Sequence, residues 1–343
     1  MNIVVPAKLS YGDSVAAISL SWGGAAVVPK AYSFGKKNIE ELLNITIVPT
    51  PNALRSAEWL DRNPQARADD LHWALNSHEI KGIISIIGGD DLIRVAKFID
   101  TKVISNNPKI FLGFSDSTIA HQLFLNAGVE SYYGPALLAG FAEEGGVFEY
   151  TVNAVRNVLF DTKVVKFTSN EASWSNARHA WHEPENFCTP RPRHPFLPWR
   201  LLHGKDTVRG RIFGGCLEVL AFSFGTYIWP KLKELGDIIL FLETSEEAPR
   251  PEIVARFLRT MASAGILKMV KGIIFGRPGG ESISQNDFML YDEMILKVLI
   301  DEEKMSDVVI FTCVDIGHTD PMMVVPYGRE TIVDPSSMSI EFL

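Results

Sequence analysis

The sequence predicts an α/β protein with a parallel sheet in its first half and a second α/β unit in its last part. Its 343 residues are enough for two domains that each bury a core. Short runs of β-branched residues, bounded by Gly or Asp, alternate with helical patterns in the way that βαβ units do. The alternation stops near residue 165 and resumes near residue 209, which indicates two units joined by a connector.

The first half contains four predicted strands and two clear helical patterns. Helices that link successive strands place them in parallel, so their carboxyl ends share one edge of the sheet. Open α/β folds bind their ligands at that edge. The predicted strands are 14–20, 45–49, 82–87 and 109–114, and the helices are 67–80 and 117–128.

The last part of the chain repeats this alternation. We therefore divide the chain into an N-terminal domain (1–165), a connecting loop (166–206) and a C-terminal domain (207–343). The predicted elements of the C-terminal domain are regular structure at 209–225, strands at 237–243, 270–276 and 307–315, and helices at 251–265 and 287–302.

The connecting loop is unusual in composition. From Thr168 to His203 the chain has no helical or strand period, and it holds Trp174, Trp181, Trp199, four histidines and five prolines. A loop of this length is usually functional or disordered, and its aromatic content argues against disorder. We expect an ordered connector.

Composition also narrows the range of partners. A net charge of −8 would repel a phosphate backbone, so we expect no nucleic acid. No apolar run is long enough to span a bilayer and the N-terminus lacks a signal-peptide pattern, so we expect no membrane partner and cytoplasmic residence. Cys188, Cys216 and Cys313 have neither disulfide nor zinc spacing, so we expect reduced thiols and no metal site. We also expect no cofactor.

Ser115, in "KIFLGFSDSTIAH", lies where a predicted strand gives way to a helix. A serine on such a turn projects its hydroxyl from the sheet edge, and the amides that follow face whatever the hydroxyl attacks. The match to G-x-S-x-G is incomplete because Ser117 occupies the last position. The alternative is that Ser115 or Asp116 caps the helix, and the pattern alone leaves both open.

A nucleophilic serine needs a base, and the base needs an acid that orients it. His318 follows the strand 307–315 in a Gly-His turn, and Glu243 ends the strand 237–243. Each has an ordinary alternative, a structural or exposed histidine and a loop carboxylate. Nevertheless, three residue types of a triad at three strand ends are less expected by chance than one.

A fourth strand end carries two glycines. Gly88 and Gly89 follow the strand 82–87 and precede Asp90 and Asp91. Glycines let backbone approach a substrate and can turn amides toward a developing oxyanion. The alternative is a simple βα turn with an aspartate N-cap.

Taken in this order, the motifs resemble the LD-carboxypeptidases of the S66 serine peptidases, a family that includes the self-immunity carboxypeptidase against microcin C. The resemblance implies a flavodoxin-like N-terminal domain with a parallel sheet, a smaller swivelling β/α C-terminal domain, an active site between them and a homodimer. The stretches that carry it are "PAKLSYGDSVAAISLSW", "QARADDLHWALNSHEIKGIISIIGGDD", "FLGFSDST", "GRIFGGCLEVL", "DIILFLETSEE", "KGIIFGRP" and "DIGHTDPMMVVPYG".

The resemblance also implies roles for particular residues. Ser115 would be the nucleophile, Glu243 the acid and His318 the base of a Ser-Glu-His triad that works through an acyl-enzyme. The helix cap then passes to Asp116 or Ser117. Backbone amides would form the oxyanion hole, at Gly89, Asp90 and Asp116.

The chain departs from the family pattern near this implied site. Many relatives have Asn at the position of Cys216 and Asp at the position of Thr244. We interpret Cys216 as a small buried residue, with substrate contact as the alternative. Glu246 and Glu247 are either a solvated loop face or, if they line the pocket, a pair that favours a substrate with an ammonium group.

The substrate divides into two possibilities. One is a peptidyl or aminoacyl nucleotide, as in microcin self-immunity, and the other is a murein tetrapeptide that loses D-alanine. The connector of this chain resembles the longer connector of the immunity branch, and Trp174, Trp181 or Trp199 could stack on a purine or only anchor the loop. We favour the nucleotide; a non-catalytic protein that binds a peptide or nucleotide is the alternative from another class. The residues predicted to bind substrate are Trp181, Trp199, Cys216 and Glu247.

Overall fold

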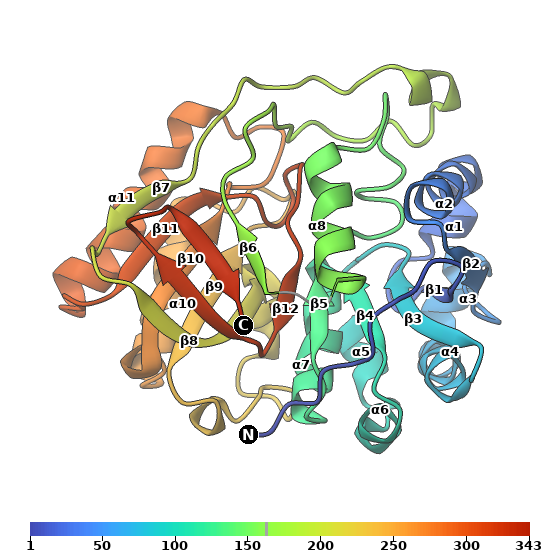
Figure 1. Cartoon of the computed structure of the whole chain (residues 1–343), viewed down its shortest axis with the longest axis horizontal. Coiled ribbons are helices and arrows are strands. Elements are labelled where there is room, and N and C mark those ends of the chain that lie inside the picture. Colours follow the sequence, from blue (N-terminus) through green and yellow to red (C-terminus); the bar gives the residue numbers. More distant parts are fainter. Residues whose placement is uncertain (162–163) are drawn as a thin grey trace.

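The computed structural model describes residues 1–161 and 164–343, and these form two sheets that lie side by side (Figure 1). One sheet has six strands in the order β12-β5-β4-β3-β1-β2, and the other has eight in the order β6-β14-β13-β8-β9-β10-β11-β7. The connector runs over one end of both sheets in Figure 1.

The six-stranded sheet confirms the predicted flavodoxin-like architecture. Strands β2, β1, β3, β4 and β5 are parallel, in the 2-1-3-4-5 order of that fold, with β12 added antiparallel to β5. The register pairs Leu112 of β4 with Ile84 of β3 and Tyr132 of β5. The strands are β1 (Ser14–Ile18), β2 (Thr46–Pro49), β3 (Ile80–Ser85), β4 (Ile110–Gly113), β5 (Ser131–Tyr133) and β12 (Val325–Tyr327).

Helices connect these strands, and two of them fall on the predicted patterns. α4 begins earlier than its apolar pattern because Pro64 occupies the first helical turn, where its missing N–H costs nothing. The helices are α1 (Gly24–Val27), α2 (Pro29–Leu43), α3 (Ala57–Arg62), α4 (Pro64–Asn76), α5 (Leu92–Ala96), α6 (Thr101–Asn106), α7 (Thr118–Asn126) and α8 (Glu149–Leu159).

The eight-stranded sheet has a parallel centre and antiparallel flanks. β8 (Val208–Cys216), β9 (Ile238–Glu243), β10 (Val270–Gly276) and β11 (Val309–Val314) are parallel and mostly buried, as continuous apolar runs predict. The predicted helix at 287–302 is α11 followed by a π-helical turn. The remaining elements are α9 (Leu217–Ser223), α10 (Pro251–Ser263), α11 (Phe288–Leu296), the π turn Lys297–Glu302, β13 (Glu330–Asp334), β14 (Ser339–Phe342) and the 3-10 turns Leu232–Glu234, Leu267–Met269 and Gln285–Asp287.

The connector is more regular than its sequence indicates. β6 (Val165–Phe167) pairs with β14, and β7 (Arg200–His203) pairs antiparallel with β11, so both ends of the connector are edge strands of the second sheet. A 3-10 turn, Pro184–Cys188, lies between them. These strands are too short to show a period, and tertiary pairing forms them.

Apolar packing is continuous between the two sheets. Leu112 and Tyr133 of the first sheet belong to the same buried cluster as Phe241 and Val314 of the second. Val324, which directly precedes β12, belongs to this cluster too. None of the described helices combines the length and apolar character that crossing a bilayer requires.

Candidate active site

Three strand ends bring Ser115, Glu243 and His318 together. Ser115 follows β4, Glu243 is the last residue of β9, and His318 lies four residues beyond the end of β11. His318 Nε2 lies 3.0 Å from Ser115 Oγ, and His318 Nδ1 lies 2.7 Å from Glu243 Oε2. These contacts have the order nucleophile, base, acid that a proton relay requires.

Ser115 occupies a sharp turn and is not the helix cap. Its φ is +61°, in the left-handed region, which costs a non-glycine residue about 1–3 kcal/mol unless its surroundings hold it there. A 3-10 turn (Ser115–Ser117) follows, and Ser117 is the cap position of α7 but makes no capping bond with its side chain. Thr118 Oγ1 donates to the Ser115 carbonyl at 2.7 Å and so holds the turn.

Tyr133, at the end of β5, joins the nucleophile to the acid and was not predicted. Its hydroxyl accepts a hydrogen bond from the Ser115 amide at 3.1 Å and donates one to Glu243 Oε1 at 2.5 Å. Burial and the Glu243 carboxylate raise the pKa of Tyr133 well above its ordinary value, so the hydroxyl keeps its proton. The same strand-end criterion would have found Tyr133, but "SYY" is too short to predict as a strand.

The carboxylates around His318 favour its charged form. Burial lowers its pKa, but the Glu243 carboxylate and then Glu246 outweigh burial and raise the pKa to about 9. Glu246 Oε2 lies 3.2 Å from Nε2, on the same nitrogen that faces Ser115. Gly317 precedes His318 with a φ of +86°, and a Cβ there would lie 2.4 Å from Glu243 Oε2, so only glycine allows this approach.

The glycine loop after β3 faces the serine. A Cβ on Gly88 would lie 3.0 Å from Ser115 Oγ and 3.4 Å from the Asp116 amide nitrogen, so this backbone lies directly beside the nucleophile. Gly89 lines the same cavity as Ser115, whereas Asp90 is exposed and outside that lining. Gly88, which the strand-end pattern named with Gly89 but the resemblance did not place in the oxyanion hole, therefore lies directly beside the hydroxyl.

The Asp116 side chain ties the serine turn to the segment after β1 and to the start of α5. It is buried, and its Oδ2 accepts hydrogen bonds from Ser21 Oγ at 2.6 Å and from the Leu92 amide at 2.8 Å. Burial raises the pKa of this carboxyl group. Nearby, Asp91 is paired at 2.7 Å with the fully buried Arg67. The Asp116 carboxylate thus braces the site, while its amide directly follows the nucleophile.

Ser115 and His318 open into a cavity of about 490 Å³. The connector forms one wall, with Asn176, Ala177, Arg178, His179, Trp181 and Arg191, and the two domains supply the rest, including Trp22, Phe114, Ala139, Glu246, Glu281, Asp320 and Met322.

The three connector tryptophans have different surroundings. Trp181 lines the cavity and stacks on His179, with ring centroids 4.6 Å apart and planes at 13°. Trp199 is 3% exposed, and its Nε1 donates to Asp315 Oδ2 at 2.6 Å. Trp174 is fully buried in a small apolar cluster of its own. Of the three, Trp181 alone lines the cavity, and the other two anchor the connector.

The other two predicted substrate contacts lie outside the cavity lining. Cys216 is 2% exposed at the end of β8, where its amide donates to Thr118 Oγ1 at 3.2 Å, as expected for a small buried residue. Glu247 borders a shallow depression beside the cavity. Its neighbour Glu246 lines both.

A cluster of Glu143, His179 and Asp320 in the cavity wall has metal-ligand residue types. Arg191 already binds two of its three members, because Nη2 lies 2.6 Å from Glu143 Oε2 and 2.6 Å from Asp320 Oδ2. Burial and Asp320 raise the pKa of Glu143, whereas the Arg191 guanidinium lowers it and favours the ionised carboxylate. A metal ion would have to displace this guanidinium, so the cluster functions as a buried ion-pair network.

Known proteins are similar to this chain in sequence. The LD-carboxypeptidase N-terminal domain matches residues 15–134 and the LD-carboxypeptidase C-terminal domain matches residues 209–333. A Vibrio cholerae protein named as a carboxypeptidase is 28% identical over 95% of this chain and 93% of its own length. The microcin C7 self-immunity protein MccF of Escherichia coli is 24% identical over 98% of this chain and 95% of its own.

A solved structure extends the likeness to three dimensions. The MccF-like protein from Streptococcus pneumoniae, crystallised in complex with AMP, superposes with a TM-score of 0.86 at 28% identity, covering 97% of this chain and 99% of that chain. Both domain matches follow the chain in the family order, and the sheets described above agree with this likeness. The chain belongs to the LD-carboxypeptidase family, S66, and is a serine-type carboxypeptidase.

Proposed function

We propose that Ser115, His318 and Glu243 form the catalytic triad and that the enzyme hydrolyses an amide bond of a peptidyl or aminoacyl nucleotide. The observation that carries this proposal is the relay of 3.0 Å from Ser115 Oγ to His318 Nε2 and 2.7 Å from Nδ1 to Glu243.

The reaction follows from these contacts. Ser115 Oγ attacks the carbonyl carbon as its proton passes to His318 Nε2, and Glu243 stabilises the imidazolium. Amides of Asp116 and of the glycine loop, at Gly88 or Gly89, stabilise the oxyanion. His318 then gives the proton to the leaving nitrogen, the C–N bond breaks, and an acyl-enzyme remains. Water, activated by the same histidine, releases the acid and restores Ser115.

The relative crystallised with AMP and the position of Trp181 support the nucleotide substrate. Trp181 offers an indole at the cavity wall, one face of which His179 covers. Aromatic rings of this kind stack on bases. A murein tetrapeptide, which would lose D-alanine, is the alternative within the family. The homodimer implied by the resemblance and the cytoplasmic location expected from the sequence stay predictions.

Mass spectrometry of product formation tests the proposal. Wild type and Ser115→Ala are each incubated with an aminoacyl sulfamoyl adenosine and with a murein tetrapeptide. Cleavage of the nucleotide by wild type alone supports the proposal, and release of D-alanine alone supports the murein alternative. Equal turnover by Ser115→Ala would overturn the triad.

A further inference from the structure

We propose that Glu246 is a specificity residue that selects substrates with a cationic side chain on the residue whose carbonyl is attacked. This inference rests on the proposed function, because it takes Ser115 as the nucleophile and concerns the same cavity. It goes further by naming the charge of the side chain that the enzyme prefers.

The position of Glu246 places a carboxylate next to the reacting atoms. Glu246 Oε2 lies 3.2 Å from His318 Nε2, which itself lies 3.0 Å from Ser115 Oγ. The Glu246 side chain is nevertheless 64% exposed, so it is accessible from the cavity. A group on the residue that Ser115 attacks would therefore lie within reach of this carboxylate.

The two residues directly before Glu246 are tied to neighbouring segments. The amide and hydroxyl of Ser245 donate to Glu218 Oε1 at 3.0 and 2.6 Å. Thr244 Oγ1 accepts a hydrogen bond from the Gly279 amide at 3.0 Å. Because its backbone is held, Glu246 presents its charge at a defined place, which is what discrimination between side chains needs.

The other charges of the cavity leave Glu246 available for a cation. The Arg191 guanidinium forms ion pairs with Glu143 and Asp320, and the Arg178 guanidinium lies 3.9 Å from the Glu281 carboxylate. In the described part of the chain, no Lys or Arg lies within ion-pair distance of Glu246, and its ionic contact is with His318.

A substrate ammonium group would pair with Glu246 and draw it from Nε2. That movement leaves Ser115 as the partner of the histidine, so binding of the preferred side chain also prepares the base. An acidic side chain would instead face Glu246 and be disfavoured by repulsion. A charge-assisted pair of this kind predicts a preference of roughly tenfold for the cation.

Matched substrates test this inference. Lysyl and norleucyl sulfamoyl adenosine differ by the ammonium group at nearly constant length, and glutamyl sulfamoyl adenosine carries the opposite charge. For wild type we expect kcat/KM for the lysyl compound to exceed that for the norleucyl compound by about tenfold or more. In Glu246→Gln the ratio should fall to about one or two, and Glu246→Lys should favour the glutamyl compound.

Glu247→Gln is the matched control, because it removes the same charge one residue along and outside the cavity lining. Equal loss of preference in both variants would assign it to the general field of the loop and overturn the role of Glu246. No preference in wild type would overturn it too. A matched lysyl and norleucyl peptide pair is assayed in parallel. If wild type cleaves neither the sulfamoyl adenosines nor these peptides, the result refutes the proposed function on which the inference rests.

Binding supplies a second readout. Calorimetry with Ser115→Ala and with Ser115→Ala/Glu246→Gln separates affinity from turnover. We expect the first variant to bind the lysyl compound about tenfold more tightly than the norleucyl compound, and the second to bind both about equally. Equal affinities in the first variant would contradict the inference.

Discussion

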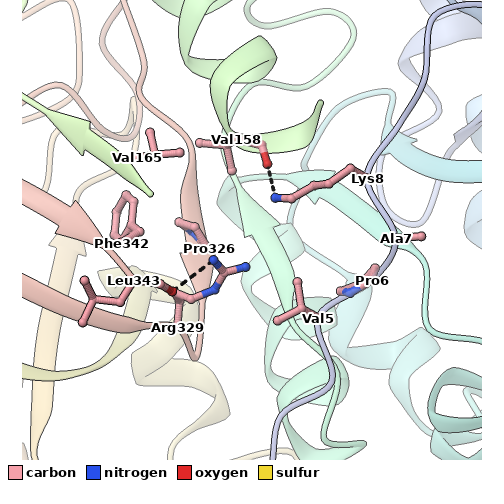
Figure 2. A pocket seen from close by; sticks show the side chains of 10 residues that line it. All are labelled: Val5, Pro6, Ala7, Lys8, Val158, Val165, Pro326, Arg329, Phe342 and Leu343. Atoms are coloured by element: carbon pink, nitrogen blue, oxygen red, sulfur yellow. Dashed lines mark hydrogen bonds between the residues drawn. The ribbon is translucent and has the colours of Figure 1, made fainter. Parts of the chain in front are cut away.

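Two cavities of similar volume differ sharply in chemistry. The cavity beside Ser115 has about 490 Å³, and a second cavity of about 450 Å³ lies between residues 5–8, Val158, Val165, Pro326, Arg329 and the last two residues (Figure 2). In the second cavity Lys8 donates to the Val158 carbonyl and Arg329 to the Leu343 carbonyl, as Figure 2 shows, and Arg329 also pairs with Glu130.

The difference lies in what reaches each cavity. The carboxyl ends of β4, β9 and β11 converge on the first and deliver an alcohol, a carboxylate and an imidazole that contact one another. In the second cavity, the Lys8 and Arg329 side chains are already paired with backbone carbonyls and with Glu130. The rest of its lining is mostly apolar. Volume alone therefore does not identify a site; converging strand ends do.

The largest expected effect is the loss of Ser115. Ser115→Ala removes the attacking oxygen, so kcat should fall by roughly 10⁴-fold or more, as for other triad nucleophiles. Single-turnover assays with the cleaved substrate measure it, and Tm should change little. Activity within tenfold of wild type would place the chemistry elsewhere and break the contrast between the cavities.

Tyr133→Phe should have an intermediate effect. It leaves the Ser115 amide and Glu243 Oε1 each without a described partner, and the loss of one such bond predicts a drop in kcat of roughly tenfold. KM should stay close to that of wild type, because Tyr133 does not line the cavity. A change confined to KM would argue that Tyr133 does not position the relay.

The pH profile sharpens the role of His318. Because its pKa is raised to about 9 and the base must be neutral, kcat/KM should rise with pH toward about 9. Glu246, like Glu243 and Glu218, raises this pKa. Glu246→Gln removes its carboxylate, so the rise of kcat/KM should move to lower pH. If kcat/KM of wild type rose with a midpoint below pH 6.5, the ordinary pKa of histidine, the result would contradict this interpretation.

The contribution of His318 to the free energy of unfolding should decrease as the pH rises. The folded-state pKa of His318 lies above its ordinary 6.5, so its contribution is complete below about pH 6.5 and is lost as the pH rises through about 9. Urea unfolding at fixed pH values checks it. The loss between these values should be smaller in His318→Gln than in wild type, and an equal loss in both would assign it to other groups.

The smallest expected effect belongs to the second cavity. Lys8→Met removes a half-buried charge whose pKa burial already lowers, together with one bond to the Val158 carbonyl. The free energy of unfolding should change by about 1 kcal/mol or less, and kcat/KM should not change. A tenfold loss of kcat/KM would show that this cavity takes part in the reaction.

Local patterns determined much of this protein from the sequence. Buried apolar runs and helical periods predicted the parallel centres of both sheets, and they placed Ser115, Glu243 and His318 at strand ends. These features depend on neighbours along the chain, which is why a sequence can reveal them.

Tertiary structure decided what depends on distant segments. The short edge strands β6, β7 and β12 form by pairing with partners far along the chain, and Tyr133 meets Glu243 across 110 residues. Which tryptophan reaches the cavity, and whether Glu246 or Glu247 does, follows from loop paths that no periodicity encodes. Contacts between separate segments are set by packing and not by local propensity, so only the folded chain could reveal them.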